Sequence, residues 1–378
     1  MIKKLTIITI FLMLICVSTK GQSVEIKPHG ISSRGVEADS NDIFKVKYNG
    51  LSNVGVGTTV YLVGEVVDTT FTNPVWNVKT KPSNSNVTII GNQDVSNTKK
   101  AISLILDLEG TYVIEFTDGG LTSEITLNAA KYLGIPTTGL SCGTCHAEEN
   151  TNWLETGHAN AVKPYIDDPK GHFQAFCLGC HTTGYDVAAS NDGFDDFDFV
   201  FPSTLVEGNY DTLVNKYPAA MQRANVQCEA CHGPGSAHNG IVADSKMISD
   251  QASATCAYCH DAGTHHAIPA LLAEAGLDAT EFDGRGFHGG HTVGAFVNST
   301  NRDGCSPCHS GAGYVQWIKE GRPSDALGLP AKTAFRPKPT NFTCVTCHDP
   351  HNSTNPFQLR AKETVLGDGT LISFQKYS

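Results

Sequence analysis

Six pairs of cysteines, each with two residues between them and a histidine directly after, are the chemistry-bearing feature of this chain of 378 residues. The six stretches read CGTCH, CLGCH, CEACH, CAYCH, CSPCH and CVTCH. Their cysteines and histidines are Cys142, Cys145, His146, Cys177, Cys180, His181, Cys228, Cys231, His232, Cys256, Cys259, His260, Cys305, Cys308, His309, Cys344, Cys347 and His348. Of the 13 cysteines in the chain, only Cys16 lies outside these stretches.

This C-x-x-C-H arrangement is the attachment signature of c-type haem. Two thiols at this spacing can each form a thioether to one edge of a porphyrin, and the adjacent histidine supplies an axial nitrogen to its iron. Structural zinc would accept a histidine anywhere near the cysteines, and redox dithiols do not occur six at a time. The sequence therefore predicts six covalently bound haem c groups. Their proximal iron ligands are His146, His181, His232, His260, His309 and His348.

Eight further histidines lie in the same part of the chain and are candidates for the second axial position on these irons. They are His158, His172, His238, His265, His266, His288, His291 and His351. Beyond the first 21 residues, only Met221 and Met247 offer a thioether sulfur. Histidine on both faces of most irons is therefore expected, and this ligation favours lower reduction potentials than histidine with methionine.

The reach of the chain limits which iron these histidines can serve. His351 follows the sixth proximal histidine by three residues, which span at most about 11 Å and cannot round the rim of a macrocycle. If His351 is a ligand, it serves a neighbouring haem. His265 and His266 would diverge on an extended chain, so one of them is expected to bind. His288 and His291 flank two glycines, and again one ligand is expected.

Residues 1–21 have the pattern of a secretory signal peptide. Lys3 and Lys4 precede an apolar run from Leu5 to Val17, and small and polar residues follow before Gln22. A membrane anchor is the alternative, but a span needs about 20 apolar residues and this run is shorter. The sequence therefore predicts export across the inner membrane, to the periplasm or the cell surface.

The charge of the mature chain narrows the classes of partner. Removal of residues 1–21 takes away three lysines and no acidic residue, which leaves 24 basic and 38 acidic residues and a formal net charge of −14. Such a surface argues against nucleic-acid binding and suits a soluble protein or a basic partner. No later stretch is apolar enough to cross a membrane. The expected partners are redox proteins, other cytochromes among them.

Residues 24–130 contain no cysteine and predict a different kind of domain. Seven short runs alternate apolar and polar residues: FKVKY, TVYLVGEVVD, NPVWNVKT, NVTIIG, AISLILD, TYVIEFTD and TSEITLN. About seven short strands are typical of an immunoglobulin-like sandwich, in which Trp76 and Tyr112 would be the buried tryptophan and the tyrosine corner. Another β-sandwich is the alternative. Residues 131–140 are predicted to be a linker.

Residues 141–361 predict a multihaem cytochrome c domain of short helices and loops, because turn residues recur and long amphipathic periods do not. About 40 residues per haem are too few for a private protein core, so the haems are expected to stack and form the core themselves. The acidic and aromatic run at 193–201 is expected to be a loop against a haem edge, with a docking patch as the alternative. Residues 362–378 predict a C-terminal hairpin.

Four stretches resemble the tetrahaem cytochrome c of nitrification and its relatives, a family that extends to multihaem enzymes of nitrogen and sulfur oxyanions. They are WLETGHA, CLGCHTTGYD, CEACHGPGSAH and CHDPHNSTNPFQLR, and the resemblance covers residues 141–361. It implies that His158 and His238, and in like manner His351, ligate a haem other than the one attached just before them. The chain departs from the tetrahaem pattern by having six sites.

These features favour an exported electron-transfer protein in which the haems form a conduit between redox partners. One alternative is an oxidoreductase of nitrogen or sulfur oxyanions or hydroxylamine with one open-coordinate haem. Another is a filament-forming conductive cytochrome. Eight spare histidines for six irons make an open position unnecessary. The family's enzymes sometimes replace the proximal histidine by lysine, and none of the six motifs does so. No catalytic residue is predicted.

Overall fold

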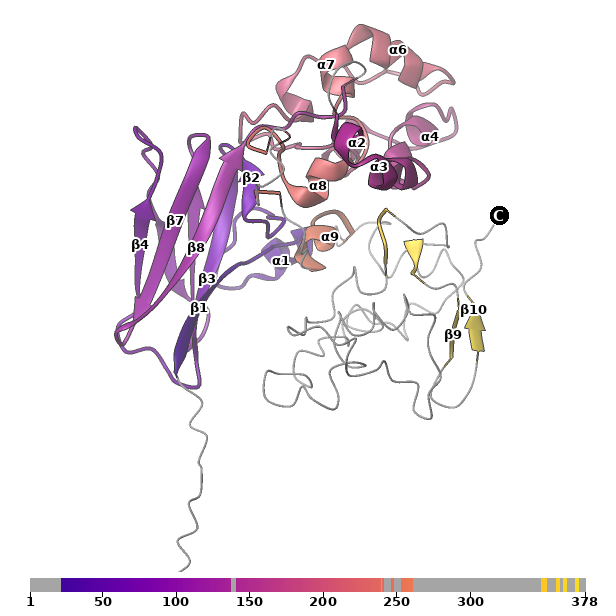
Figure 1. The fold of residues 1–378 in the computed structure, drawn as a ribbon. Coiled ribbons are helices and arrows are strands. Elements are labelled where there is room, and N and C mark those ends of the chain that lie inside the picture. The colour runs from indigo at the N-terminus through magenta and orange to yellow at the C-terminus, as the bar shows by residue number, and fades with distance from the viewer. Residues whose placement is uncertain are drawn as a thin grey trace, which may run out of the picture.

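The computed structural model describes residues 22–136, 141–238, 240, 246–247, 253–260, 348–351, 358–360, 363–365 and 371–373. These residues form an N-terminal β-sheet region, followed by a region of helices and loops (Figure 1). Within these ranges, no helix has the length and apolar character that crossing a membrane requires.

Two four-stranded sheets build the N-terminal region. The order of strands is β1-β3-β6-β5 in one sheet and β2-β8-β7-β4 in the other. The strands are β1 Ser23–Pro28, β2 Asn53–Gly55, β3 Thr59–Val67, β4 Val75–Thr80, β5 Ile90–Asp94, β6 Lys99–Ile105, β7 Gly110–Asp118 and β8 Leu121–Ala130. Neighbouring strands pair antiparallel except β2 and β8, which run parallel.

A hydrophobic core lies between the two sheets, because alternate side chains of a strand point to the same face. Tyr61, Tyr112 and Phe116 are among its largest fully buried members. Trp76 of β4 packs on Phe116 with ring centroids 4.6 Å apart. The hydroxyl of Tyr112, near the start of β7, donates to the carbonyl of Leu108 at 2.8 Å and accepts from its N–H at 3.0 Å. These two bonds tie the β6–β7 turn to the core.

Residues 44–48 are not a strand, so the prediction from their alternating pattern is wrong. The carboxylate of Asp39 accepts hydrogen bonds from the N–H groups of residues 43 and 44 at 2.5 and 2.7 Å. The hydroxyl of Tyr61 accepts from the N–H groups of residues 45 and 46 at 2.9 and 3.2 Å. Because side chains occupy these donors, the segment cannot pair in a ladder, and only Tyr48 forms an isolated bridge with Ile31.

Four elements of this region differ from the sequence prediction in other ways. Strands β1 and β2 are not predicted, because β1 buries only one side chain and β2 is three residues long. The run at 86–91 becomes a strand only at Ile90, because the carboxylate of Asp107 binds the backbone N–H of Asn86 at 2.5 Å. A short helix, α1 Ser33–Ala38, is also unpredicted and begins where Ser32 caps it.

The second region consists, in its described part, of helices of eight residues or fewer joined by loops. They are α2 Cys142–Cys145, α3 Ala147–Leu154, η1 His158–Asn160, α4 Lys163–Ile166, η2 Ala175–Cys177, α5 Leu178–His181, η3 Phe194–Asp196, α6 Asn209–Lys216, α7 Pro218–Met221, α8 Cys228–His232 and α9 Ser253–His260. In the C-terminal tail, where the sequence predicts a hairpin, β9 Glu363–Val365 and β10 Leu371–Ser373 pair antiparallel.

A second hydrophobic cluster holds α4 to α7 together, with Ile166, Leu178 and Phe194 among its buried members. The acidic and aromatic run at 193–201 lies along this cluster. Its phenylalanines pack inward, whereas the carboxylate of Asp196 caps the turn before η3 by accepting from two backbone N–H groups. The placement of this run against a haem edge stays a prediction.

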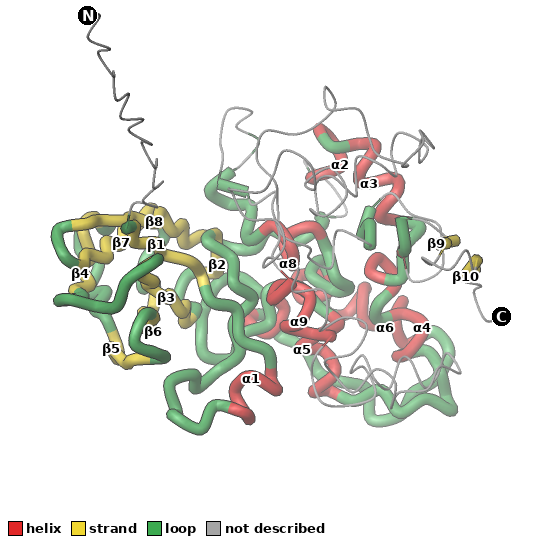
Figure 2. Tube along the Cα trace, turned by 90° about the horizontal axis from the view of Figure 1, so that it is seen from below, coloured by secondary structure: helices red, strands yellow, loops and turns green. Residues whose placement is uncertain are grey.

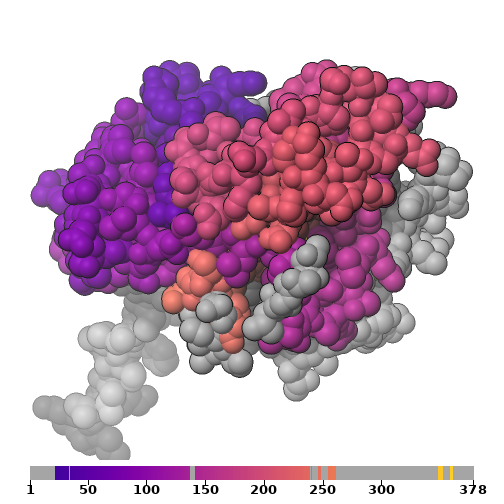
Figure 3. Space-filling model, turned by 90° about the horizontal axis from the view of Figure 1, so that it is seen from above, coloured from indigo at the N-terminus to yellow at the C-terminus, as the bar shows by residue number. Residues whose placement is uncertain are grey.

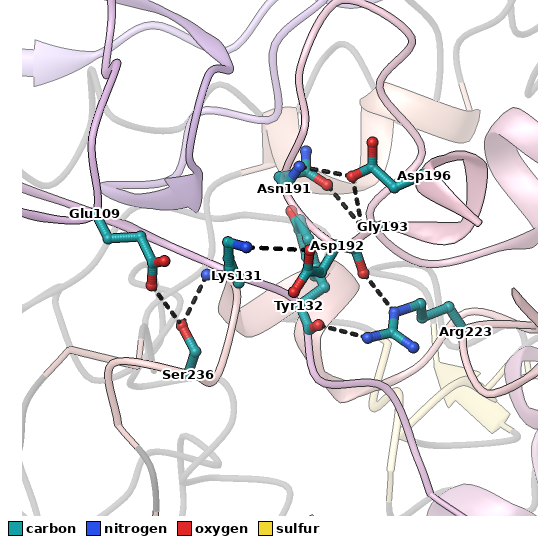
Figure 4. Close-up of polar contacts among 9 residues, drawn as sticks. All are labelled: Glu109, Lys131, Tyr132, Asn191, Asp192, Gly193, Asp196, Arg223 and Ser236. Atoms are coloured by element: carbon teal, nitrogen blue, oxygen red, sulfur yellow. Dashed lines mark hydrogen bonds and ion pairs between the residues drawn. The ribbon is translucent and has the colours of Figure 1, made fainter. Parts of the chain in front are cut away.

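Residues 131–136, here called the strap, follow β8 and run across the helical region (Figure 4). The guanidinium of Arg223 donates to the carbonyl of Tyr132 at 2.9 Å. The carboxylate of Glu229 accepts from the N–H groups of residues 133 and 134 at 3.0 and 2.7 Å. The strap is therefore hydrogen-bonded to the helical region.

The β-sheet region and the helical region are in direct contact. Figure 3 shows their atoms meeting without a gap on the face that it draws.

Candidate functional site

Four of the six C-x-x-C-H motifs lie wholly among the described residues, at 142–146, 177–181, 228–232 and 256–260. Each forms a helical turn, in α2, in η2 with α5, in α8 and at the end of α9. Residues three apart share one face of such a turn, so both cysteines of a motif point to one side. Of the sixth motif only His348 is described. Outside the described residues lie Cys305, Cys308, His309, Cys344 and Cys347.

None of the eight cysteines in these four motifs is in a disulfide. Sulfur atoms of different motifs nevertheless meet in two places. Cys142 of the first motif and Cys228 of the third share a hydrogen bond, which lowers the pKa of Cys142 and raises that of Cys228. Cys180 of the second motif and Cys259 of the fourth share another, which lowers the pKa of Cys180 to about 6. The fold thus brings the first motif beside the third and the second beside the fourth.

Two pairs of histidines have the separation that a shared iron requires. The ring centroids of His158 and His260 are 6.1 Å apart. Those of His232 and His351 are 5.9 Å apart, with ring planes 15° from parallel. Two metal–nitrogen bonds of about 2 Å, plus the distance from each nitrogen to its ring centre, give about 6 Å. Each pair joins a proximal histidine to a histidine that follows a different motif.

The protonation state of His158 suits this role. Burial and the neighbouring ring of His260 lower the pKa of His158 to about 4. The imidazole is therefore neutral at pH 7, which is the form in which histidine ligates a metal.

The stretch WLETGHA positions His158 through a tight turn. Trp153 is buried at the end of α3 and donates its indole N–H to the carbonyl of Val226 at 3.1 Å. Thr156 donates its hydroxyl to the carbonyl of Trp153 at 2.7 Å, and the N–H of Val226 donates to the carbonyl of His158 at 3.1 Å. This turn therefore fixes His158 against the chain that leads into the third motif.

His181 of the second motif is held by its surroundings in the same manner. Its Nδ1 hydrogen-bonds the carbonyl of Ala161, and the rings of Tyr165 and Phe173 pack edge-on at 5.3 and 5.1 Å. A histidine whose Nδ1–H donates to a carbonyl presents Nε2 to a metal. The contact with Ala161 and the two aromatic rings therefore fix the orientation of the His181 ring.

The remaining predicted ligands lie in different surroundings. The Nδ1 of His238 is buried and makes no hydrogen bond to any described residue. His146 and His172 are exposed. Met221 packs in the second hydrophobic cluster, and the sulfur of Met247 accepts a hydrogen bond from the side-chain amide of Asn53. Outside the described residues lie His265, His266, His288 and His291, whose ligation stays a prediction.

Three residues that the sequence analysis missed support these motifs. Glu229 lies between the two cysteines of the third motif, is only 3% exposed, and accepts from backbone N–H groups of the strap. Burial raises the pKa of Glu229, although these donors and Arg223 oppose the effect. Its signal was visible, because it is the one charged residue inside any of the six cysteine pairs. Lys47 and Asn53 reach the motifs from the β-sheet region and carry no sequence signal.

The donor set fits haem c. Two reduced thiols on one face of a turn match one porphyrin edge, the next histidine matches the iron, and in two cases a second histidine lies about 6 Å away. The C-x-x-C-H motifs therefore indicate covalently bound haem c.

Comparison with known proteins gives two family matches. Residues 141–197, which contain the first two motifs, match the family of cytochrome c554 and c-prime. Residues 338–366, which contain the sixth motif, match the doubled CXXCH motif family. No curated protein and no solved structure matches the chain. The two matches support a multihaem c-type cytochrome, and such domains suggest electron transfer with redox partners.

Proposed function

We propose that this chain is an exported hexahaem c-type cytochrome that carries electrons between redox partners through closely packed haems, most of them ligated by histidine on both faces. The observation that carries the proposal is the pairing of His158 with His260 and of His232 with His351. An iron with two axial histidines has no position left for a substrate, and it exchanges electrons without exchanging a ligand. Such irons favour a carrier over an enzyme.

The proximity of the motifs supports transfer from haem to haem. Cysteine sulfur anchors the edge of a macrocycle, so motifs whose sulfurs touch bring two haem edges together. Cys142 with Cys228 and Cys180 with Cys259 are two such contacts. The histidine pairs add two further connections, from the fourth motif to the segment after the first, and from the third to the segment after the sixth. Every described motif is thereby linked to another.

In this proposal haem c supplies an iron that takes up one electron and gives it back. The residues of the chain attach, orient and tune that group. The cysteines fix the ring covalently, the histidines set a low range of potentials, and the bonds of Trp153 and His181 hold two of the ligands in place.

We also propose that residues 24–130 form an immunoglobulin-like domain, with residues 131–140 leading to a haem domain at 141–361. In an immunoglobulin-like sandwich the strands A-B-E-D form one sheet and C-F-G the other. The order β1-β3-β6-β5 in one sheet and β8-β7-β4 in the other supports this assignment, with β2 added beside β8. The bonds of Tyr112 to Leu108 support a tyrosine corner, and buried Trp76 lies on the strand equivalent to C.

Export is part of the proposal. The signal peptide at 1–21 would deliver the chain to the periplasm or cell surface, where the haems would exchange electrons with other redox proteins. The support is the consumption of every cysteine beyond that segment by a haem motif. The mature N-terminus, determined by mass spectrometry of the exported protein, tests this part, and an uncleaved leader would contradict it.

The test of the whole proposal is a haem count and a ferric spectrum of the purified exported protein. We expect an intact mass that corresponds to the mature chain with six haems, and an electron paramagnetic resonance spectrum with only low-spin signals. A lower count would overturn the hexahaem assignment. A high-spin signal that shifts with nitrite, sulfite or hydroxylamine would favour the enzyme, and sedimentation of large polymers would favour the filament.

A further inference from the structure

One stretch of the β-sheet region, residues 47–58, contacts three of the four described motifs; we call it the wall segment. The backbone carbonyl of Asn49 accepts from the hydroxyl of Thr255 in α9 at 3.1 Å, next to the fourth motif. The side-chain amide of Asn53 donates to the carbonyl of His232 in the third motif at 3.3 Å. The Nζ of Lys47 lies near the Sγ of Cys180 in the second motif. Figure 2 shows α5 and α9 together on the side of the helical region that faces the strands.

Lys47 brings a positive charge to the place where the second and fourth motifs meet. Its Nζ lies 4.0 Å from the Sγ of Cys180 and 3.9 Å from the ring centroid of Tyr258. Tyr258 belongs to the fourth motif, and its neighbour Cys259 shares a hydrogen bond with Cys180. Among the residues that the structure describes, no carboxylate lies within ion-pair distance of Lys47. Lys47 is partly buried and has no described counter-charge.

The backbone around Lys47 is fixed, so its charge is held near the sulfurs. The next residue, Tyr48, is 1% exposed and exchanges two backbone hydrogen bonds with Ile31 at 2.7 and 2.8 Å. The backbone at Gly30 packs so closely on α9 that a Cβ placed there would lie 2.2 Å from the Cβ of Ala254. On such a backbone the ammonium group of Lys47 stays close to the sulfur atoms, whereas the ammonium group of an exposed lysine samples many positions in solvent.

We propose that the positive charge of Lys47 raises the reduction potential of the haems attached through Cys180 and Cys259. The inference rests on the proposed function. When ferric iron takes one electron from a reductant or an electrode, the charge of the site falls by one unit. A fixed positive charge beside the haem edge stabilises the reduced state, and partial burial weakens the screening of that charge by salt. Lys47 therefore raises these potentials above the value that ligation alone sets.

A purely structural role is the competing explanation, because a cation over an aromatic ring also stabilises a contact. The two explanations differ in what the charge does. Lys47→Met removes the charge and keeps an apolar stem, whereas Lys47→Arg keeps the charge. Lys45→Met is the matched control, because Lys45 lies two residues away, is exposed, and pairs with Asp42.

The experiment is a potentiometric titration of each holoprotein, followed by its haem absorbance. For Lys47→Met we expect about a tenfold loss in the equilibrium constant for reduction of one or two haems, which is about 59 mV for a one-electron couple. The other haems should keep their potentials, and the ferric spectrum should stay low-spin. Lys47→Arg and Lys45→Met should titrate like the parent protein.

Three results would overturn the proposal: Lys47→Met titrating like the parent, Lys45→Met shifting as much, or Lys47→Arg shifting like the methionine variant. If Lys47→Met does not accumulate, the folded parent protein is acetylated and then titrated, with acetylated Lys47→Arg as the background. Acetylation must then lower the reduction potential of one or two haems further in the parent protein than in Lys47→Arg. The haem count and spin state of the same parent sample test the proposed function separately, so the two failures are distinguishable.

Discussion

At the scale of single residues, the chemistry depends on which histidine faces which motif. His158 follows the first motif in the chain but lies beside His260 of the fourth, and His351 follows the sixth but lies beside His232 of the third. The short spacing from His348 to His351 already excluded a shared iron for that pair. The neutral state of His158, which follows from its lowered pKa, completes the requirement for a ligand.

His158→Ala tests the ligation at this scale. Removal of the imidazole should leave the iron of the fourth motif with one axial ligand, because no side chain of the new residue can bind it. We expect a high-spin ferric signal equivalent to about one of the six predicted haems, measured by electron paramagnetic resonance. His29→Ala is the control, because His29 is exposed in the β-sheet region and should leave all signals low-spin. An unchanged low-spin spectrum in His158→Ala would remove this residue from the ligand set.

At the scale of elements, the strap and α8 depend on one buried carboxylate. Glu229 accepts from the N–H groups of Leu133, Gly134 and Gly235, at 3.0, 2.7 and 2.6 Å. The N–H groups of Gly134 and Gly235 are buried with Glu229, which is itself 3% exposed, whereas Leu133 is exposed. The third motif is therefore anchored to the segment that leaves the β-sheet region, and the position of α8 follows from that anchor.

Glu229→Ala should destabilise the holoprotein by roughly 3 kcal/mol, because each buried donor left unsatisfied costs about 1–3 kcal/mol and the strap can relax in part. The measurement is the midpoint of guanidinium unfolding, with haem absorbance as one probe and far-ultraviolet circular dichroism as the other. Glu229→Gln should lose less stability, because the amide oxygen of glutamine still accepts hydrogen bonds from these N–H groups. Exposed Glu155→Ala should change the midpoint little. Equal midpoints for Glu229→Ala and Glu155→Ala would show that the strap does not rely on Glu229.

At the scale of the whole molecule, the two regions are packed together by contacts that are distant in the sequence. Thr58 donates its hydroxyl to the carboxylate of Asp186 at 3.0 Å, and Asn53 donates to the carbonyl of Pro234 at 3.1 Å. Gly233 has a φ of +83°, and a Cβ there would lie 2.4 Å from the backbone oxygen of Asn53. The β-sheet region therefore packs directly against the helical region that carries the motifs.

Gly233→Ala should loosen this packing, because it combines a strained φ with a backbone clash. Gly240→Ala is a matched control: its φ is +74°, but no atom of the described residues lies within 4 Å of a Cβ placed there. We expect limited proteolysis between the two regions to be about tenfold faster in Gly233→Ala than in the control, as roughly 1.4 kcal/mol of extra opening would produce. Equal cleavage rates in the two variants would contradict a tight interface at Gly233.

Local patterns explain what was predictable in the β-sheet region. Strand β7 was expected because apolar and polar residues alternate along it, and its residues alternate in burial in the structure. Strands β3 and β6 were expected from similar apolar runs, although β3 buries five consecutive residues. The same rule failed at residues 44–48, where Asp39 and Tyr61 occupy the backbone donors. It also missed β1 and β2, whose pairing is set by neighbours far along the chain.

The haem chemistry could be predicted from the sequence, because covalent attachment and the proximal ligand need only five consecutive residues, and six such stretches are visible without a fold. The folded structure was needed to show that the second motif lies beside the fourth, that His158 lies beside His260, and that Lys47 lies at the sulfur of Cys180. The physical reason is distance along the chain. A second axial ligand, a neighbouring haem edge and a nearby charge are supplied by segments that come together only when the chain folds.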